Sequence, residues 1–492
     1  MHQIDLNVMN PFLSNSIKEP LWYRIVKYSI GGCILMPVRF VISIALALAV
    51  TFLATVASIG LPAKAPNPEP LSWWRRSLLS FIPPLLRCML FTWGFYRIRT
   101  TGKFIRGPDR APIVVANHTS MVDAIYMASL FIPCGISRVE NLSLPVFSSV
   151  LKATQSILVD RNDVSSRKDT KDQIHNRAQK AAEDSRYFPI LIFPEGTTTN
   201  GKSLICFKIG AFSSGLPVQP VCLSYPNRYC DVSWTMNAPN IFFQMIKMMS
   251  QFANYMKVDF LPPYYPNEQE KSDPQLYANN VRKLMAEKLR VTTSNHTFED
   301  VTLLIESKKL SVPMNSIGMI EVKKIEELYH LSLSDIKSLL KRFAEVDKNK
   351  SGWIEPEEFA KMLNLPLNET ILDLFYMFDR DGDGKIDFKE FLVGLSLLRA
   401  ETNDSTDVLR HWFNVLDVNE DGYISFDEFS SIFFSSFEYI TKKDICTLFD
   451  QIPKKKKGMI SFEEFYGYAK DNEIYIKMAS NLLMKKKEQI NS

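Results

Sequence analysis

The stretch IVVANHTSMVDAIYM, Ile113 to Met127, joins an apolar run to an apolar helix through a polar turn. Its opening residues, Ile-Val-Val-Ala, favour a strand that is covered on both faces. Ser120 and Asp123 have the S-x-x-D spacing of a capping box, which predicts a helix that begins near Met121. A strand, a polar turn and a capped helix in this order are typical of an α/β fold, in which functional side chains gather at the carboxyl ends of strands.

The same alternation continues from about residue 100 to 300. Short apolar runs (PIVVA, SILVD, PILIFP and LPVQPVCLSY) alternate with longer polar and apolar stretches such as Ser166 to Arg186. We therefore expect an α/β domain over residues 100–300, with a mixed sheet that is flanked by helices.

His118 and Asp123 interrupt the apolar pattern, and two interpretations of the pair stay open. The capping box explains the aspartate without any chemistry, but it leaves the histidine without a role. Side chains five residues apart on one regular helix are rotated by about 140° and cannot pair. A histidine just before the helix can meet a carboxylate in its first turns, however, and a base held by an orienting acid activates a hydroxyl.

Four short motifs occur in the order of the four blocks of the glycerolipid acyltransferases. They are H-x4-D (His118 and Asp123), an arginine after a strand in ILVDRND (Arg161), F-P-E-G-T (Phe193 to Thr197) and a proline-bearing strand in LPVQPV (Leu216 to Val221). From about Arg99 to Val291 the chain therefore resembles this family, which implies an α/β acyltransferase domain with acyl-CoA as co-substrate and no catalytic metal.

The resemblance also implies roles for single residues. His118 would be the general base that takes the proton of a lysolipid hydroxyl as it attacks the thioester, and Asp123 would orient it. The residues implied to position the acceptor are Asn117, Arg161, Glu195, Gly196 and Thr197. The strand Pro217 to Val221 would border the acyl chain. The Met-rich segment Asn240 to Tyr265 is either a wall of the lipid tunnel or a core or membrane-surface helix.

One departure from the family pattern bears on the acceptor. Enzymes that act on lysophosphatidic acid commonly read E-G-T-R-S, where the arginine can bind a phosphomonoester in bidentate fashion. Here Thr198 stands in place of that arginine. The segments EGTTTN, FKIGAF and PVQPV resemble the lysophosphatidylcholine acyltransferase branch, which includes enzymes that also use acetyl-CoA. A lysophosphatidic acid acyltransferase and a membrane calcium sensor with an inactive enzyme domain remain the alternatives.

Residues 40–61 form a run of 22 residues without a charge, which is long enough to cross a bilayer. About 40 residues with several basic side chains precede the run, which disfavours a cleaved signal peptide. We expect a transmembrane anchor behind an N-terminal segment, 1–39, with a buried helix of a soluble core as the alternative. Within residues 62–99, the apolar stretch 78–99 contains Pro83, Pro84 and Arg87, which favours an interfacial or re-entrant segment over a second span. The resemblance implies the endoplasmic reticulum membrane, with the Golgi membrane or lipid droplets as further locations.

The overall composition limits the classes of partner. The 58 Lys and Arg residues nearly balance 54 Asp and Glu, giving a formal net charge of +4. A nucleic-acid-binding protein usually has a stronger basic excess, so we expect no nucleic-acid partner. The seven cysteines are scattered without a C-x-x-C pair, which predicts reduced thiols. A length of 492 residues predicts two or three domains.

The last third repeats the spacing of an EF-hand calcium loop three times, with glycine at position 6. The residue at position 7 binds through its backbone carbonyl. The predicted ligands are Asp347, Asn349, Ser351, Trp353 and Glu358 in loop 347–358, Asp379, Asp381, Asp383, Lys385 and Glu390 in loop 379–390, and Asp417, Asn419, Asp421, Tyr423 and Glu428 in loop 417–428. Carboxylate, amide and carbonyl oxygens suit Ca²⁺, so we expect an all-α calcium-binding domain over residues 328–470.

Two further features concern the arrangement of these loops. Position 8 is an isoleucine in each loop, namely Ile354, Ile386 and Ile424, which predicts that loops pair through a short β contact. A fourth unit near 453–464 has unsuitable residues at its ligand positions, namely Pro453, Lys455 and Lys457. We expect it to bind no metal and to pair with the third loop. Residues 301–327 are expected to form a connector and residues 471–492 a basic tail.

Overall fold

The computed structural model describes residues 10–15, 17, 19–62, 68–143, 145–159, 164–313, 321–329, 331–363, 367, 369–379, 381–400, 413, 417, 421–430, 446, 449–454 and 458–469. Arg161, Asn419 and the expected basic tail lie outside the described residues. The chain divides into two compact units, Met1–Val301 and Thr302–Ser492, and each is described by itself.

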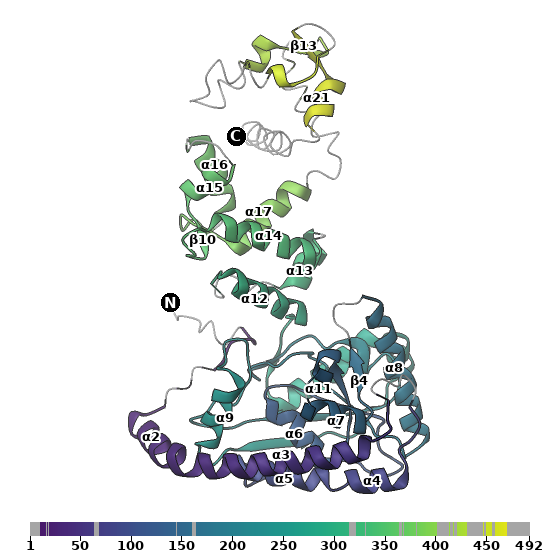
Figure 1. Ribbon diagram of the computed structural model, residues 1–492. Helices are drawn as coiled ribbons and strands as arrows, with labels where there is room; N and C mark the ends of the chain where they lie inside the picture. The colour runs from purple at the N-terminus through teal and green to yellow at the C-terminus, as the bar shows by residue number, and fades with distance from the viewer. Residues whose placement is uncertain are drawn as a thin grey trace. The chain divides into compact units, whose positions relative to one another are not determined.

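A seven-stranded sheet forms the centre of the first unit, with the order β1-β8-β7-β2-β5-β3-β4 (Figure 1). Its strands are β1 Ile98–Thr101, β2 Ile113–Ala116, β3 Cys134–Arg138, β4 Ile157–Val159, β5 Ile190–Ile192, β7 Val218–Ser224 and β8 Met256–Phe260. All neighbours are parallel except β7 and β8, so the predicted mixed sheet is confirmed. Because β2, β5 and β7 are mutually parallel, their carboxyl ends meet at one edge.

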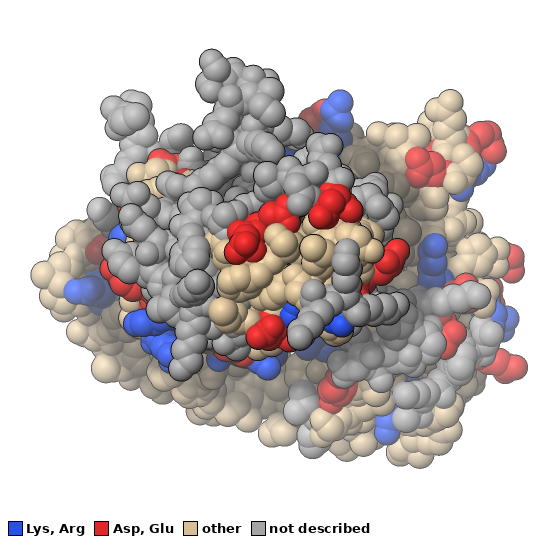
Figure 2. Space-filling view, turned by 90° about the horizontal axis from the view of Figure 1, so that it is seen from above, with Lys and Arg blue, Asp and Glu red and all other residues tan. Residues whose placement is uncertain are grey.

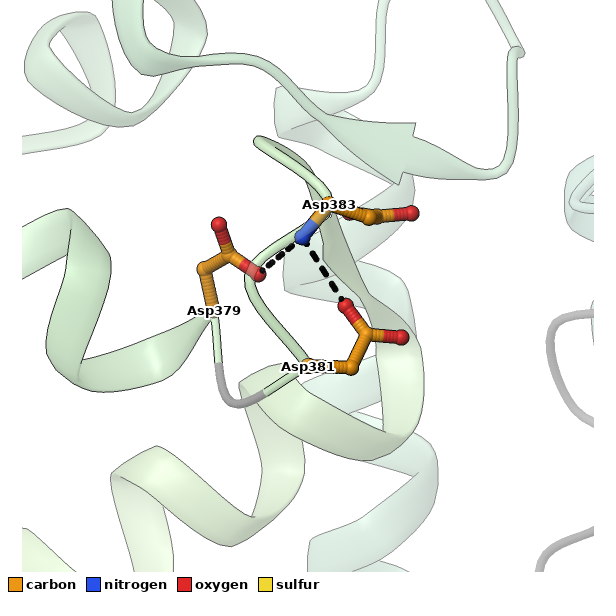
Figure 3. A group of neighbouring side chains, drawn as sticks. All are labelled: Asp379, Asp381 and Asp383. Carbon is orange, nitrogen blue, oxygen red and sulfur yellow. Dashed lines mark hydrogen bonds between the residues drawn. The ribbon is translucent and has the colours of Figure 1, made fainter.

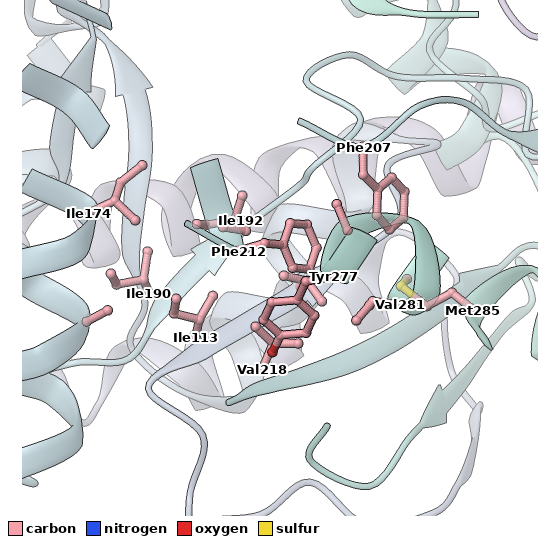
Figure 4. Packing of buried hydrophobic residues seen from close by; sticks show 14 of the residues in the cluster. Ile113, Ile174, Ile190, Ile192, Phe207, Phe212, Val218, Tyr277, Val281 and Met285 are labelled. Carbon is pink, nitrogen blue, oxygen red and sulfur yellow. The ribbon is translucent and has the colours of Figure 1, made fainter. Parts of the chain in front are cut away.

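Successive residues of β2 enter two different hydrophobic cores, because side chains alternate across a strand. Ile113 and Val115 lie in the core that Figure 4 shows, together with residues of α8 (Val164–Glu183) and α11 (Pro274–Leu289). Val114 and Ala116 lie in the other core, with residues of α5 (Ile82–Thr92), α6 (Met121–Leu130) and α9 (Ile241–Met249). The strand is buried on both faces, as its sequence predicts.

The first unit also contains short elements around this framework. They are α4 Trp73–Leu79, η2 Val139–Ser143, α7 Pro145–Ala153, β6 Ser203–Leu204, η3 Ile209–Ala211, α10 Glu268–Ser272 and β9 Thr292–Thr293. The expected interfacial or re-entrant segment, 62–99, thus contains the two short helices α4 and α5, each of which is too short to cross a bilayer.

One continuous helix of 38 residues, Leu21–Ser58, precedes α4 and is long and apolar enough to cross a membrane. It comprises α2 Leu21–Val26, the π-helical η1 Lys27–Leu35 and α3 Met36–Ser58. One face of α3 packs against α5 and α7, along which it extends in Figure 1. Arg39 on α3 is buried against the rest of the unit, whereas apolar residues such as Val41, Leu48 and Phe52 are exposed on the other face.

The second unit is built from EF-hand helices and short paired strands. Its described elements, of which α12 has its first four residues before the division, are α12 Phe298–Leu310, α13 Val322–Tyr329, α14 Leu333–Val346, β10 Trp353–Ile354, α15 Pro356–Leu363, α16 Glu369–Phe378, β11 Ile386–Asp387, α17 Phe388–Ala400, β12 Tyr423–Ser425, β13 Met459–Ser461 and α21 Phe462–Ala469. The range 301–327, expected as a connector, therefore contains most of α12 and most of α13.

The predicted pairing of the calcium loops is confirmed. Ile354 of β10 pairs with Ile386 of β11, which joins the first two loops. Ile424 of β12 pairs with Ile460 of β13, which joins the third loop to the fourth unit.

On the face that Figure 2 shows, acidic and basic side chains surround uncharged areas, in line with the near balance of charge in the sequence.

Candidate active site

His118 and Asp123 lie together at the carboxyl edge of the sheet. His118 follows β2 by two residues, and Asp123 is in the first turn of α6. The distance between Nδ1 of the histidine and Oδ2 of the aspartate is 3.0 Å. The aspartate side chain is fully buried, whereas 21% of the histidine side chain is exposed. A buried acid thus holds the Nδ1 edge of a ring that solvent or substrate can reach.

The same carboxylate also caps α6. Its Oδ2 atom accepts hydrogen bonds from the backbone N–H groups of Thr119 and Ser120, both at 2.7 Å. The Ser120 hydroxyl in turn accepts a bond from Val122 N at 3.3 Å, so the predicted capping box is present. The two interpretations of the sequence are therefore not alternatives, because one aspartate serves both the cap and the histidine.

A fourth donor to Asp123 comes from the end of β7. The hydroxyl of Tyr225 donates a hydrogen bond to Oδ1, the carboxylate oxygen that does not face His118. The pKa of Tyr225 lies well above its usual value, because its hydroxyl is buried and stands beside a carboxylate. None of the sequence motifs singles out this tyrosine. Its position just after a strand of the same sheet was visible, but its partner lies 102 residues away in the sequence.

The F-P-E-G-T turn after β5 lies beside His118. Phe193 stacks on the imidazole with ring centroids 4.1 Å apart and an angle of 19° between the planes. Glu195 accepts the backbone N–H of His118 at 2.8 Å. Thr199 donates its own N–H to the carbonyl of His118 at 2.9 Å. The turn therefore fixes both the ring and the backbone of the histidine.

Glu195 is fully buried, although the family resemblance implies a role in positioning the acceptor. Burial raises the pKa of this carboxyl to about 8, more than its hydrogen bonds from the backbone of His118 and Ile205 lower it. A buried carboxyl bonded to the backbone of the dyad supports the site from below its surface. Gly196 and Thr197 are partly buried, so the turn becomes accessible directly after Glu195. Gly196 has a φ of 72°, which favours glycine at this position.

Asn117 also acts on the backbone. Its side-chain amide donates to the carbonyl of Leu223 at 2.9 Å and accepts the N–H of the same residue at 2.7 Å. This pair of bonds extends the pairing of β2 and β7 by one step. Since only 2% of Asn117 is exposed, it shapes the site rather than presenting a group to a ligand.

The loop 231–237 and the N-terminal segment 10–15 form a further layer. Trp234 donates its backbone N–H to the carbonyl of Thr119 at 2.9 Å, and its own carbonyl accepts a bond from the hydroxyl of Thr198. Asn200 donates its backbone N–H to the carbonyl of Pro11 at 2.8 Å. Two segments that lie far apart in the chain therefore hold the loops that contact the dyad, and no motif in the sequence indicates this layer.

The EF-hand loops share one internal pattern. In each loop the carboxylate at position 1 accepts the N–H of the glycine at position 6 at 2.9 Å, the pairs being Asp347 with Gly352, Asp379 with Gly384 and Asp417 with Gly422. Asp379, Asp381 and Asp383 offer carboxylate oxygens that lie within 4.8 Å of one another (Figure 3). Such a set of oxygens fits a hard divalent cation such as Ca²⁺.

At the twelfth position the glutamates cap the helices that leave the loops. Oε2 of Glu390 accepts the N–H of Asp387 at 3.0 Å, and that of Glu428 accepts the N–H of Ser425 at 2.9 Å. Glu358 accepts the N–H of Glu355 at 3.3 Å. Of the other predicted ligands that the structure describes, Asn349, Ser351, Lys385 and Asp421 lie in the loops, and Trp353 and Tyr423 begin β10 and β12.

Comparisons with known proteins agree with this architecture. The acyltransferase family model matches residues 97–224, and EF-hand domain pair models match residues 336–392, 368–434 and 438–472. The match to a solved 1-acyl-sn-glycerophosphate acyltransferase from Thermotoga maritima covers 51% of this chain and 98% of that chain, with 18% identity and a TM-score of 0.33.

Two curated relatives extend over nearly the whole chain. Lysophosphatidylcholine acyltransferase 2 of Homo sapiens is 37% identical over 480 residues, which is 97% of this chain and 86% of the relative. Lysophosphatidylcholine acyltransferase 1 of Homo sapiens is 32% identical over 450 residues, 91% of this chain and 82% of the relative. Similarity of this extent, together with the acyltransferase and EF-hand domains, shows that the chain is an acyltransferase and belongs to the lysophosphatidylcholine acyltransferase family.

Proposed function

We propose that the protein transfers an acyl group from acyl-CoA to the free hydroxyl of lysophosphatidylcholine, with His118 as the general base. The observation that carries this proposal is the 3.0 Å contact between His118 Nδ1 and the buried carboxylate of Asp123. A carboxylate oxygen can only accept, so Nδ1 carries the proton and Nε2 keeps its lone pair. The partly exposed ring can then take a proton from a substrate hydroxyl.

The reaction proceeds by direct attack. As Nε2 of His118 removes the proton, the lysolipid oxygen bonds to the carbonyl carbon of the thioester. The carbon–sulfur bond then breaks, and the sulfur leaves as a thiolate that takes the proton back from Nε2. The products are the diacyl lipid and free CoA, and the histidine returns to its neutral form. Asp123 stabilises the positive charge that the imidazole carries while it holds the proton. General-base catalysis of this kind typically contributes about 10² to 10⁴ in rate.

The groups around the dyad divide into supporting and exposed ones. Asn117 and Glu195 are buried and bonded to backbone, so we assign them to holding His118 in place. Gly196 and Thr197 lie on the accessible side of the turn, where they can face the acceptor. Arg161, which lies outside the described residues, is proposed as a further contact to the lipid phosphate, because guanidinium groups bind phosphate oxygens well.

The choice of lysophosphatidylcholine rests on Thr198 and on the names of the relatives. Threonine is uncharged, so position 198 adds no positive charge to the site. The hydroxyl of Thr198 donates a hydrogen bond to the carbonyl of Trp234. A phosphomonoester has more charge to neutralise than a phosphodiester with a choline head group. Both named human relatives are lysophosphatidylcholine acyltransferases. Use of acetyl-CoA as a second donor is part of the proposal.

The protein is membrane-associated, and we propose the endoplasmic reticulum as its compartment. We further propose that the helix Leu21–Ser58 lies along the enzyme with both of its ends on the cytosolic side. Arg39 donates hydrogen bonds to the carbonyls of Met249 at 2.5 Å and Phe252 at 3.2 Å, so a helix that left the enzyme would carry an unpaired charge into the lipid. The uncharged outer face of α3 would contact the acyl chains.

Protease treatment of sealed microsomes tests this placement. With one epitope tag at each terminus, both tags are expected to be digested from outside. A protected N-terminal tag beside a digested C-terminal one would mean that the helix crosses the bilayer once, as the run 40–61 alone predicts. Protection of both tags would place the enzyme on the lumenal side.

We also propose that the three intact loops bind Ca²⁺, through the ligands given above. The loop 379–390 is expected to bind most tightly, because it supplies five carboxylates, namely Asp379, Asp381, Asp383, Asp387 and Glu390. Sensor EF-hands bind Ca²⁺ with dissociation constants of about 10⁻⁷ to 10⁻⁵ M. Sites of this affinity can act as sensors only on the side of the membrane where the calcium concentration varies in that range.

The deciding experiment for the activity is an assay of the purified full-length protein against a panel of lysolipids and acyl-CoAs. We expect transfer to lysophosphatidylcholine and a loss of at least a hundredfold in His118→Ala, from the usual contribution of a general base. A preference for lysophosphatidic acid would show that the branch is wrong. Calcium binding without transfer to any acceptor would favour the sensor alternative.

A further inference from the structure

Tyr225 contacts the dyad through Asp123 but belongs to none of the four family motifs. It directly follows β7, and its ring packs edge-on against Phe95 with centroids 6.2 Å apart and an angle of 68°. Phe95 is fully buried at the turn that follows α5, where its N–H donates to the carbonyl of Leu90 at 3.0 Å. The phenol is therefore held by a fixed wall, with its hydroxyl directed at Oδ1 of Asp123.

We propose that Tyr225 is a positioning residue for the His118–Asp123 dyad, which fixes the carboxylate and limits how strongly the dyad holds a proton. The proposal rests on the roles assigned above to His118 and Asp123. It adds a residue that lies outside all four sequence motifs.

The positioning follows from how the donors are shared between the two carboxylate oxygens. Oδ2 of Asp123 accepts from three donors, namely His118 Nδ1, Thr119 N and Ser120 N. Among the residues that the structure describes, the hydroxyl of Tyr225 is the one hydrogen-bond donor to Oδ1. A carboxylate held at both oxygens cannot twist about its last side-chain bond, so Oδ2 stays in line with the imidazole.

The electrostatic effect has a definite direction. A hydrogen bond to a carboxylate draws negative charge from it, so the carboxylate attracts the imidazolium less strongly. Removal of the phenol hydroxyl leaves more charge on Asp123 and stabilises the protonated dyad. His118 should then remain protonated, and inactive as a base, up to a higher pH.

Other titratable and charged groups face this site from each neighbouring element. They are Glu195 from the turn after β5, Tyr126 from α6, Arg87 from α5 and Lys208 beside Gly196. Since burial raises the pKa of Glu195 to about 8, this group stays protonated through the acidic range. Tyrosine, arginine and lysine do not change charge there either. A shift on the acidic side of the rate profile therefore reports on the dyad.

The test compares Tyr225→Phe with a matched buried tyrosine in the full-length protein. Tyr277 is fully buried in the core that Figure 4 shows, and its hydroxyl donates to the carbonyls of Leu216 at 3.0 Å and Tyr264 at 3.3 Å. Tyr277→Phe thus loses a similar hydrogen bond far from the dyad. For each variant kcat and KM are measured from about pH 5 to 9, the range in which a histidine base titrates.

We expect Tyr225→Phe to lower kcat about tenfold with little change in KM, and to move the acidic limb upward by about half a pH unit. Tyr277→Phe should lower the melting temperature without moving the limb. An unchanged kcat and limb in Tyr225→Phe would overturn the proposal. A loss of kcat with an unmoved limb would also overturn it, since packing alone explains that result.

Two further measurements keep the proposal testable. If Tyr225→Phe does not fold, Tyr225→3-fluorotyrosine keeps the shape and strengthens the donor, and the limb should then move to lower pH; no movement would overturn the proposal. His118→Ala in the same assay distinguishes a wrong base assignment from a wrong role for Tyr225. If His118→Ala is inactive while Tyr225→Phe behaves as wild type, the base assignment stands and the role of Tyr225 is wrong. Activity in a folded His118→Ala would overturn both.

Discussion

The substitution Asp123→Asn separates the two tasks of this side chain. The carboxylate is fully buried and accepts four hydrogen bonds, three at Oδ2 and one at Oδ1. An asparagine has the same shape and keeps one acceptor oxygen. That oxygen can still take the N–H groups of Thr119 and Ser120, while the amide N–H₂ can donate to the oxygen of Tyr225. The cap of α6 should survive, at a cost of about 1 kcal/mol in unfolding free energy.

The effect on catalysis should be much larger than the effect on stability. Without the negative charge, the imidazolium that forms during the attack has no counter-charge in contact with Nδ1. If most of the contribution of the base is lost, kcat falls by about 10² to 10⁴. At about 1.36 kcal/mol for each factor of ten, this corresponds to about 2.7 to 5.4 kcal/mol in the activation barrier.

The assay measures kcat for acyl transfer together with the unfolding free energy of the same preparation. Asp123→Ala serves as the comparison, because it leaves two buried N–H groups without their acceptor, at about 1 to 3 kcal/mol each. We expect Asp123→Asn to be stable and inactive, and Asp123→Ala to be both unstable and inactive. If Asp123→Asn keeps more than about a tenth of wild-type kcat, or if activity merely follows the folded fraction, Asp123 is a cap and the dyad is wrong.

Three other predictions concern single side chains. Burial raises the pKa of Glu195 to about 8 from its usual 4.5, so the folded protein keeps a proton that the unfolded chain has lost between these values; the unfolding free energy should fall as pH rises from about 4.5 to 8, and Glu195→Gln should remove this part of the slope in denaturant titrations. Thr198→Arg should shift the ratio of kcat/KM toward lysophosphatidic acid by adding a charge-assisted contact, and an unchanged ratio would show that position 198 does not read the phosphate. Glu390→Gln should weaken calcium binding by one site in calorimetric titration of the full-length protein, and an unchanged titration would contradict the assigned second loop.

The sequence predicted single strands and helices well, but it did not predict which strands lie next to one another in the sheet. The β-branched run and the capping box in Ile113–Met127 specify β2 and the start of α6, because both signals are local. The order of the strands is not local. β8 lies between β1 and β7, and pairs parallel with the first and antiparallel with the second. Which strands meet depends on packing across the whole unit, which no short stretch records.

The same distinction applies to the N-terminal helix. Arg39 directly precedes the uncharged run, and a basic residue at this position is typical of the end of a transmembrane anchor. Its side chain is instead buried and bonded to the carbonyls at the end of α9, more than 200 residues away in the sequence. Hydropathy measures how apolar a run is, but it does not show which face of the helix carries its few polar groups or what they contact.

The spacing H-x4-D can now be understood from the geometry of the cap. A capping box needs an acid at the third helical position, where its oxygen can reach back to the N–H of the capping residue. The same oxygen that reaches Ser120 N also reaches Thr119 N and the ring of His118, because the chain before the helix is extended and turns around the carboxylate. The five-residue separation, which excludes a pair on a regular helix, is therefore what a pair across a helix start requires. It follows that the cap is part of the catalytic arrangement: a change that moves the first turn of α6 relative to β2 should displace Asp123 from His118 even when both residues remain.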